Sequence, residues 1–86
     1  NNPQVRIAAR AFARRIAPKA DAGLEDVVRA GYRAALARQP SREELEDGIT
    51  FIREQRATYP PAQAWESAVA DFCQVLFCLN EFIYLD

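Results

Sequence analysis

Residues 72–79 read FCQVLFCL, and Gln74 is the only polar residue among them. A helix that is apolar almost all the way round is buried on most of its sides. We therefore expect the helix containing this segment to be the central and most buried element of the fold. It is expected to begin near Ala62, after two prolines. The wide apolar face expected for it consists of Trp65, Ala68, Val69, Phe72, Val75, Leu76, Leu79 and Ile83.

A first helix is expected to follow Asn2-Pro3, because asparagine is a favoured cap and proline is tolerated at the first helical position. It should end near Ile16, since Pro18 disfavours a helical residue before it. Arginines form one flank of this helix. Its expected apolar face consists of Val5, Ala8, Ala9, Phe12 and Ile16.

Two more helices are expected before the central one. The first of them should be capped by Asp21 and run to about Arg38. It carries Gly31 in the middle of its apolar stripe, which predicts close approach of another helix there. The next begins at Ser41, because Ser41 and Glu44 have the spacing of a capping box, the strongest local signal in the chain.

The fold class predicted from these patterns is all-α, a compact bundle of four helices with short connections and the fourth helix most buried. Apolar residues do not alternate with period two anywhere, so no strand is expected. At 86 residues the chain has room for a single helical domain, residues 1–86. It contains no methionine, and we expect it to be the C-terminal fragment of a larger protein.

Charge is distributed unevenly along the chain. Residues 1–40 carry eight basic and three acidic side chains, and residues 41–86 carry three basic and nine acidic ones. The arginines of the first helix are candidate anion-binding residues for a polyanion such as a sulfated polysaccharide. The other interpretation is that they form a solvated flank paired with the acidic half of the chain. These candidate residues are Arg6, Arg10, Arg14 and Arg15.

The chain lacks the residue types that several kinds of catalytic and metal sites require. The chain has no histidine, which removes the commonest general base and metal ligand. Cys73 and Cys78 stand five apart on one helix, too far for a disulfide, and no Cys-x-x-Cys pair exists for zinc or Cys-x-x-Cys-His for covalent haem. We therefore predict no catalytic residue, no metal site and no cofactor within this chain.

The second and third helices, joined at Gln39-Pro40-Ser41, have the outline of a helix-turn-helix motif for DNA. The recognition helix would present Glu43, Glu44, Glu46 and Asp47, which are wrong for phosphate. We predict no nucleic-acid partner. No segment approaches the roughly 18 apolar residues of a membrane span, so no membrane insertion is expected.

Four apolar residues fit no buried face. Ile7 and Ala11 project from the far side of the first helix, and Phe77 and Cys78 lie near the polar side of the fourth. We predict that these four line the contact with the remainder of the parent chain. An exposed patch would support this prediction, and full burial within these residues would contradict it.

Three stretches are together similar to a known family. They are NNP leading to ARAFA over residues 1–13, YRAALARQP followed by EEL over residues 32–45, and ADFCQVL ending in NEFIYLD over residues 70–86. Their order and spacing resemble the C-terminal part of the planctomycete PSD-one domain, a domain of unknown function in large secreted bacterial proteins. Cys78 and Leu79 stand where that family more often has small polar residues. The middle stretch is also similar to phycobilisome-linker-like repeats, which are structural modules.

The resemblance implies an extracytoplasmic or periplasmic parent protein, which handles polysaccharide or electron transfer and often carries c-type haem in another domain. It supplies no catalytic residues. For the terminal motif we expect a structural role. Phe82 and Ile83 should pack under the bundle, and Asn80 and Glu81 should hydrogen-bond the end of the fourth helix and a neighbouring helix start. Full exposure of both Phe82 and Tyr84 would weaken this expectation. The function expected is a non-catalytic module that makes interdomain or protein–protein contacts.

Overall fold

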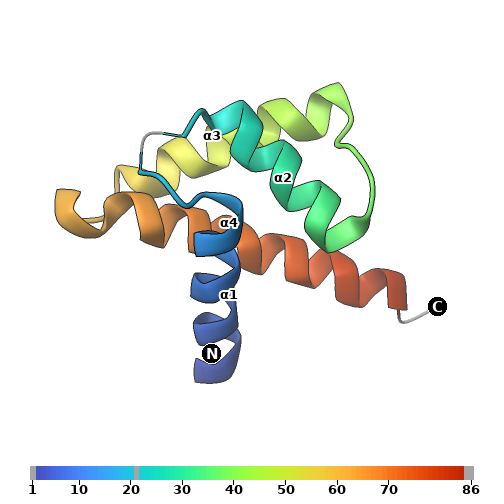
Figure 1. Ribbon diagram of the computed structural model, residues 1–86, viewed down its shortest axis with the longest axis horizontal. Helices are drawn as coiled ribbons and strands as arrows, with labels where there is room; N and C mark the ends of the chain where they lie inside the picture. Colours follow the sequence, from blue (N-terminus) through green and yellow to red (C-terminus); the bar gives the residue numbers. More distant parts are fainter. Residues whose placement is uncertain (1, 21, 85–86) are drawn as a thin grey trace.

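The computed structural model describes residues 2–20 and 22–84, with side chains described through Asn80. Over these residues the chain forms four helices and no strand (Figure 1). The predicted all-α bundle is therefore confirmed. The helices are α1 (Pro3–Ile16), α2 (Leu24–Leu36), α3 (Arg42–Arg56) and α4 (Pro61–Tyr84).

The start and end of α1 follow the sequence signals. The Asn2 side chain accepts a hydrogen bond from the backbone N–H of Gln4 at 2.9 Å, and Pro3 occupies the first turn. Proline needs no backbone donor at that position, so it does not disturb the helix. The helix ends at Ile16, as predicted from Pro18.

The bounds of α2 differ from those expected. Gly23 is the residue before its first turn and provides no side-chain cap, while Asp21, the expected cap, lies outside the described residues. The helix ends at Leu36 rather than near Arg38, because Ala37 adopts the left-handed conformation with φ 56°. A left-handed residue cannot continue a right-handed helix, so the chain turns there toward Pro40.

The capping box at the start of α3 is confirmed. The Ser41 hydroxyl accepts from the backbone N–H of Glu44 at 3.1 Å, and the Glu44 carboxylate accepts from the N–H of Ser41 at 2.8 Å. Arg38 adds two hydrogen bonds to that carboxylate, at 2.8 and 2.9 Å. The Arg38 hydrogen bonds and those from Ser41 lower the pKa of Glu44 from 4.5 to about 2.

Replacing Glu44 with glutamine is expected to lower the free energy of unfolding at pH 7 by up to about 1 kcal/mol. The loss comes from the negative charge, because a glutamine oxygen can still accept from the Ser41 N–H, and it stays small because solvent screens the Arg38 pair. The folded pKa lies below the unfolded one, so this stability is present above pH 4.5 and is lost as the pH falls toward 2. Thermal unfolding at pH 7 and pH 2 measures both quantities. Glu43→Gln, an exposed neighbour, is the control, and a Glu44→Gln deficit that persists at pH 2 would contradict the assignment.

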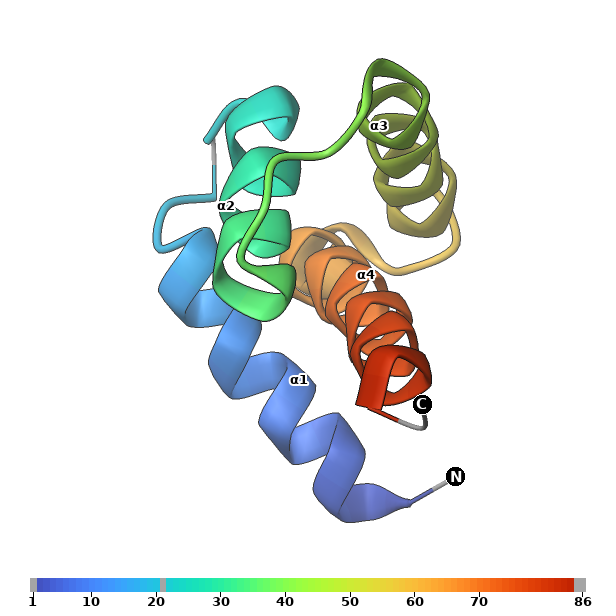
Figure 2. The same cartoon turned by 90° about the vertical axis from the view of Figure 1, so that its right-hand side faces the viewer.

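The fourth helix is the centre of the fold, as the sequence predicts. It contacts each of the other three helices. Figure 2 shows α1 and α3 on opposite sides of it, with α2 lying over a third side. Its buried residues are Ala64, Ser67, Ala68, Val69, Ala70, Phe72, Cys73 and Leu76. The prediction is wrong for two residues of the expected buried face, because Val75 is 41% exposed and Leu79 is 37% exposed.

The buried face of α1 is also rotated from the expected one. Ala9 and Ala13 are its buried residues, whereas Ala8, expected on the buried face, is exposed. The reason is electrostatic, because Arg6 and Arg10 turn toward carboxylates of α4 and bring the adjoining alanines against that helix. The small side chains let α1 cross α4 closely and steeply (Figure 1).

Gly31 marks the close approach that the sequence predicts. A Cβ added there would lie 2.8 Å from Cδ1 of Leu76 and 3.0 Å from Cε2 of Phe72, both on α4. The missing side chain therefore lets α2 pack onto the most buried part of α4. Gly48 likewise lets α3 pack closely on α2, since a Cβ there would lie 3.0 Å from Cγ1 of Val28.

Candidate interaction surface

The arginines on one flank of α1 face carboxylates of α4. Arg6 Nη1 lies 2.7 Å from Oδ1 of Asp71, and Arg10 Nη1 lies 3.1 Å from Oε1 of Glu66. Arg14 Nε lies 3.3 Å from the other oxygen of Glu66. The pairs become more exposed from Arg6 toward Arg14. The exposed pairs each contribute about 0–1 kcal/mol, so they orient α1 more than they stabilise it.

Asp71 is the centre of a larger polar network. Its Oδ1 accepts from Arg6, and its Oδ2 accepts from Gln55 Nε2 and Tyr59 Oη, both at 2.8 Å. The Arg6 guanidinium also donates to Oε1 of Gln74 at 2.8 Å. The network joins α1, the end of α3 and the middle of α4. The hydrogen bond to Asp71, followed by burial and the nearby negative charge, raises the pKa of Tyr59.

Sequence reasoning missed Asp71 as a connecting residue. The available signal was a carboxylate directly before the apolar segment 72–79, on a helix expected to be buried. A buried or half-buried charge requires a partner, and that requirement points to an arginine elsewhere in the chain.

The four predicted anion-binding arginines do not form one accessible basic surface. Arg6, Arg10 and Arg14 are paired with α4. Within the described part of the chain Arg15 has no ion pair, and its guanidinium carbon lies 5.9 Å from the centre of the Phe12 ring. A polyanion would therefore meet mainly Arg15 and the outer part of Arg14.

The four apolar candidates are not in equivalent positions. Ile7 is 67% exposed, and Ala11, one turn further along the same side of α1, is also exposed. Phe77 is half-buried and its ring centre lies 5.5 Å from that of Phe12. Cys78 is exposed and projects about 100° around α4 from Phe77. Ile7 and Ala11, which we call the outer face of α1, are thus uncovered within the described structure.

The terminal motif is positioned differently from the expectation. The helix continues to Tyr84, so Asn80 lies inside α4 and is not at its end. Asn80 is half-buried and borders a shallow depression near the start of α1, which Asn2, Val5, Ala8 and Phe77 also line. The other residues of the motif, Glu81, Phe82, Ile83 and Tyr84, lie outside the described side chains.

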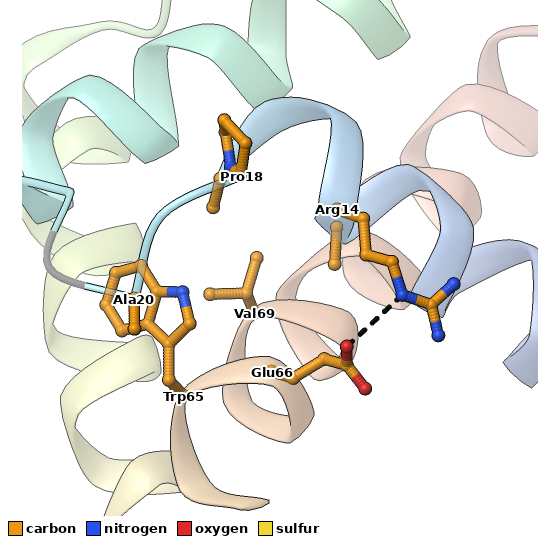
Figure 3. A pocket seen from close by; sticks show the side chains of 8 residues that line it. Arg14, Pro18, Ala20, Trp65, Glu66 and Val69 are labelled. Atoms are coloured by element: carbon orange, nitrogen blue, oxygen red, sulfur yellow. Dashed lines mark hydrogen bonds and ion pairs between the residues drawn. The ribbon is translucent and has the colours of Figure 1, made fainter.

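A pocket of about 360 Å³ lies between α1 and the first half of α4 (Figure 3). Trp65 and Val69 form its apolar side, and the ion pair of Arg14 with Glu66 borders it. The indole N–H of Trp65 is buried without a hydrogen-bond partner among the described residues. Arg56 stacks on this indole, with its guanidinium carbon 5.1 Å from the ring centre. The charged groups at the rim are thus already engaged with other side chains.

The two cysteines differ in their burial. Both are free thiols, as predicted. Burial raises the pKa of Cys73 to about 12, which keeps its thiol protonated, whereas Cys78 is exposed.

Among the described residues no group of three His, Cys, Asp or Glu side chains is placed to hold a metal ion. No helix of that same part is both long and apolar enough to cross a membrane.

Comparison with protein-family models, curated proteins and solved structures finds no match for this chain. The side chains and surfaces described above are therefore the basis for a functional proposal.

Proposed function

We propose that this chain is a non-catalytic helical module of a large secreted bacterial protein, which contacts another domain of that protein through the outer face of α1. The observation that carries the proposal is the exposure of Ile7 on a helix whose opposite side is packed on α4. The parent protein resembles those with a planctomycete PSD-one domain, is extracytoplasmic or periplasmic, and carries any c-type haem in another domain.

The energetic argument starts from the composition of α1. Its contact with α4 is made by alanines, by paired arginines and by Phe12, whose ring centre lies 5.5 Å from that of Phe77. Its largest exposed apolar side chain, Ile7, lies on the side away from the core. Burying one isoleucine side chain contributes about 1.5–3 kcal/mol. A partner surface that covers the outer face of α1 would gain most of this free energy, because Ile7 is 67% exposed, and would not disturb the bundle.

The non-catalytic assignment is supported by the side chains available. The chain has no histidine, and the thiol of Cys73 stays protonated at neutral pH. The alternative function, binding of a sulfated polysaccharide along α1, has less support. An incoming sulfate would compete with Asp71 and Glu66 for three of the four arginines.

Thiol labelling tests the proposal. Ile7→Cys is prepared in a Cys78→Ser background, with Thr50→Cys on the exposed side of α3 as the matched control. Cys73 is retained because its buried, protonated thiol reacts slowly. The labelling rate with a maleimide is measured in the 86-residue chain and in the protein at its full natural length.

In the full-length protein we expect the thiol at position 7 to react on the order of tenfold more slowly, since burial limits thiol access. The thiol at position 50 should keep its rate. Equal rates at position 7 in the two proteins would show that no domain covers the outer face of α1.

A further inference from the structure

A second surface, on other helices, has both apolar and acidic character. It is an open groove of about 220 Å³ where α2, α3 and the middle of α4 meet. Tyr32, Phe51, Phe72 and Val75 form its apolar wall, and Gly48 forms part of its floor. The carboxylates of Glu44 and Asp47 border it. We call this the α3–α4 groove.

The apolar wall continues along α4 beyond the groove. Val75 and Leu79 are exposed large apolar side chains four residues apart, so they lie one turn apart on the same side of the helix. Phe51 on α3 is half-buried and lines the groove together with Val75. A row of apolar side chains at this spacing matches the apolar side of another helix, whose anchors also recur every three or four residues.

The charge of the rim is negative. The first two turns of α3 carry Glu43, Glu44, Glu46 and Asp47, while the arginines beside them are Arg38 and Arg42. Arg38 is held by Glu44, and Arg42 lies 3.7 Å from Glu46. Within the described residues Asp47 has no ion pair, and its side chain is exposed at the groove. Asp47 is therefore the carboxylate available to an incoming cation.

The titration of Tyr32 is consistent with that negative charge. Burial raises its pKa first, and the charges of Glu44 and Asp47 raise it further against the opposing effect of Arg38. The Tyr32 ring also stacks with Arg38, whose guanidinium carbon lies 5.3 Å from the ring centre. The aromatic wall of the groove thus already interacts with a cation on one side.

We propose that the α3–α4 groove binds a basic amphipathic helix of a partner protein. Apolar side chains of that helix would cover Val75 and Leu79, and the methylene stem of a lysine would lie on Phe51 with its ammonium at Asp47. Lysine suits this position because its stem packs on apolar surface while its charge stays at the rim. The same negative rim repels phosphate, which disfavours nucleic acid and anionic membranes as occupants.

Calorimetric titration with a defined peptide tests this proposal. The probe is an amphipathic peptide of about 18 residues, with leucines on one side and lysines on the other, long enough to become helical on binding. Asp47→Lys is compared with Glu46→Lys, an equal charge change at an exposed residue one position away, outside the groove lining. The Arg42 pair lost with Glu46 is long and exposed, so it contributes little.

We expect Asp47→Lys to weaken peptide binding on the order of tenfold, or about 1.4 kcal/mol, and Glu46→Lys to weaken it by less than about twofold. Backbone amide shifts on titration should change most at Gly48, Val75 and Leu79. Circular dichroism of both variants checks that the helices are intact.

Equal weakening by the two variants would show diffuse charge attraction and overturn the proposal. It would also fail if the lysine peptide does not bind, if duplex DNA or anionic vesicles bind with the same dependence on Asp47, or if the shifts centre on Ile7. The groove and the outer face of α1 are on different helices, so this test can fail while the labelling test succeeds.

Discussion

Replacing Leu76 with alanine is expected to lower the free energy of unfolding by about 2–5 kcal/mol. Leu76 is fully buried, and its Cδ1 lies in the space left by Gly31 at the crossing of α2 and α4. Removing three carbon atoms there leaves a cavity between two helices whose backbones are already in close approach, so neighbouring side chains have little room to fill it. A domain of this size has a total stability of roughly 4–13 kcal/mol, so the variant loses a large share of it.

Leu79→Ala is the matched control, because it makes the same change one turn further along α4 at a residue that is 37% exposed. We expect it to cost less than about 1 kcal/mol, since no enclosed cavity forms. Urea unfolding followed by circular dichroism at 222 nm gives both free energies. Similar losses for the two variants would mean that α4 is not the centre of the core.

The helices are predicted well where the signal is local. The apolar segment 72–79 identifies the central helix, because a helix that is apolar on nearly all sides is stable only when most of those sides are buried. The capping box of Ser41 and Glu44 identifies the start of α3 because both partners lie within one turn. Gly31 indicates a close helix crossing because glycine in a helix interior is otherwise unfavourable.

The rotation of α1 is not predicted because its cause is distant in sequence. Arg6 pairs with Asp71, 65 residues further along the chain, and that pair turns Ala13 inward in place of Ala8. A prediction from hydrophobic periodicity assumes that arginine faces solvent. It therefore places the buried face of α1 further round the helix from Arg6 than the structure does. The exposure of Val75 and Leu79 is likewise a tertiary property, because periodicity alone does not say which part of an apolar face another helix covers.

Of the two candidate surfaces, one can be predicted from the sequence and the other cannot. Ile7 and Ala11 are found from sequence because they do not fit the apolar periodicity of their own helix, and the structure leaves both exposed. The α3–α4 groove is not found, because its lining comes from three helices that only the tertiary structure brings together. In the sequence Asp47 belongs to an acidic helix start, which is typical of dipole complementarity and does not indicate a groove.

Replacing Asp71 with alanine is expected to lower the free energy of unfolding by about 2–3 kcal/mol. The carboxylate accepts hydrogen bonds from Arg6, Gln55 and Tyr59, and the Arg6 and Asp71 side chains are only 28% and 14% exposed. In the variant the three donors lose this acceptor, and the partly buried charge of Arg6 loses its paired carboxylate. Water reaches part of the site, which keeps the loss below that of a fully buried pair.

Glu66→Ala separates this effect from a general loss of charge. Glu66 also joins α4 to arginines of α1, but its side chain is 44% exposed, so we expect a loss of less than about 1 kcal/mol. Urea unfolding at pH 7 compares the two variants. Equal losses would mean that the Asp71 network contributes no more than an exposed ion pair.

Alkaline titration adds a readout that a change in packing would not produce. Asp71 raises the pKa of Tyr59 in the folded chain, so the Tyr59 hydrogen bond stabilises the fold below the ordinary tyrosine pKa of 10.0 and is lost as the pH rises through the folded value. Absorbance of tyrosinate against pH should therefore show one tyrosine ionising at lower pH in Asp71→Ala than in the parent chain. Glu66→Ala should leave that curve unchanged. If the tyrosine titration of Asp71→Ala matches that of the parent chain, Tyr59 does not donate to Asp71, and only Gln55 links the end of α3 to this carboxylate.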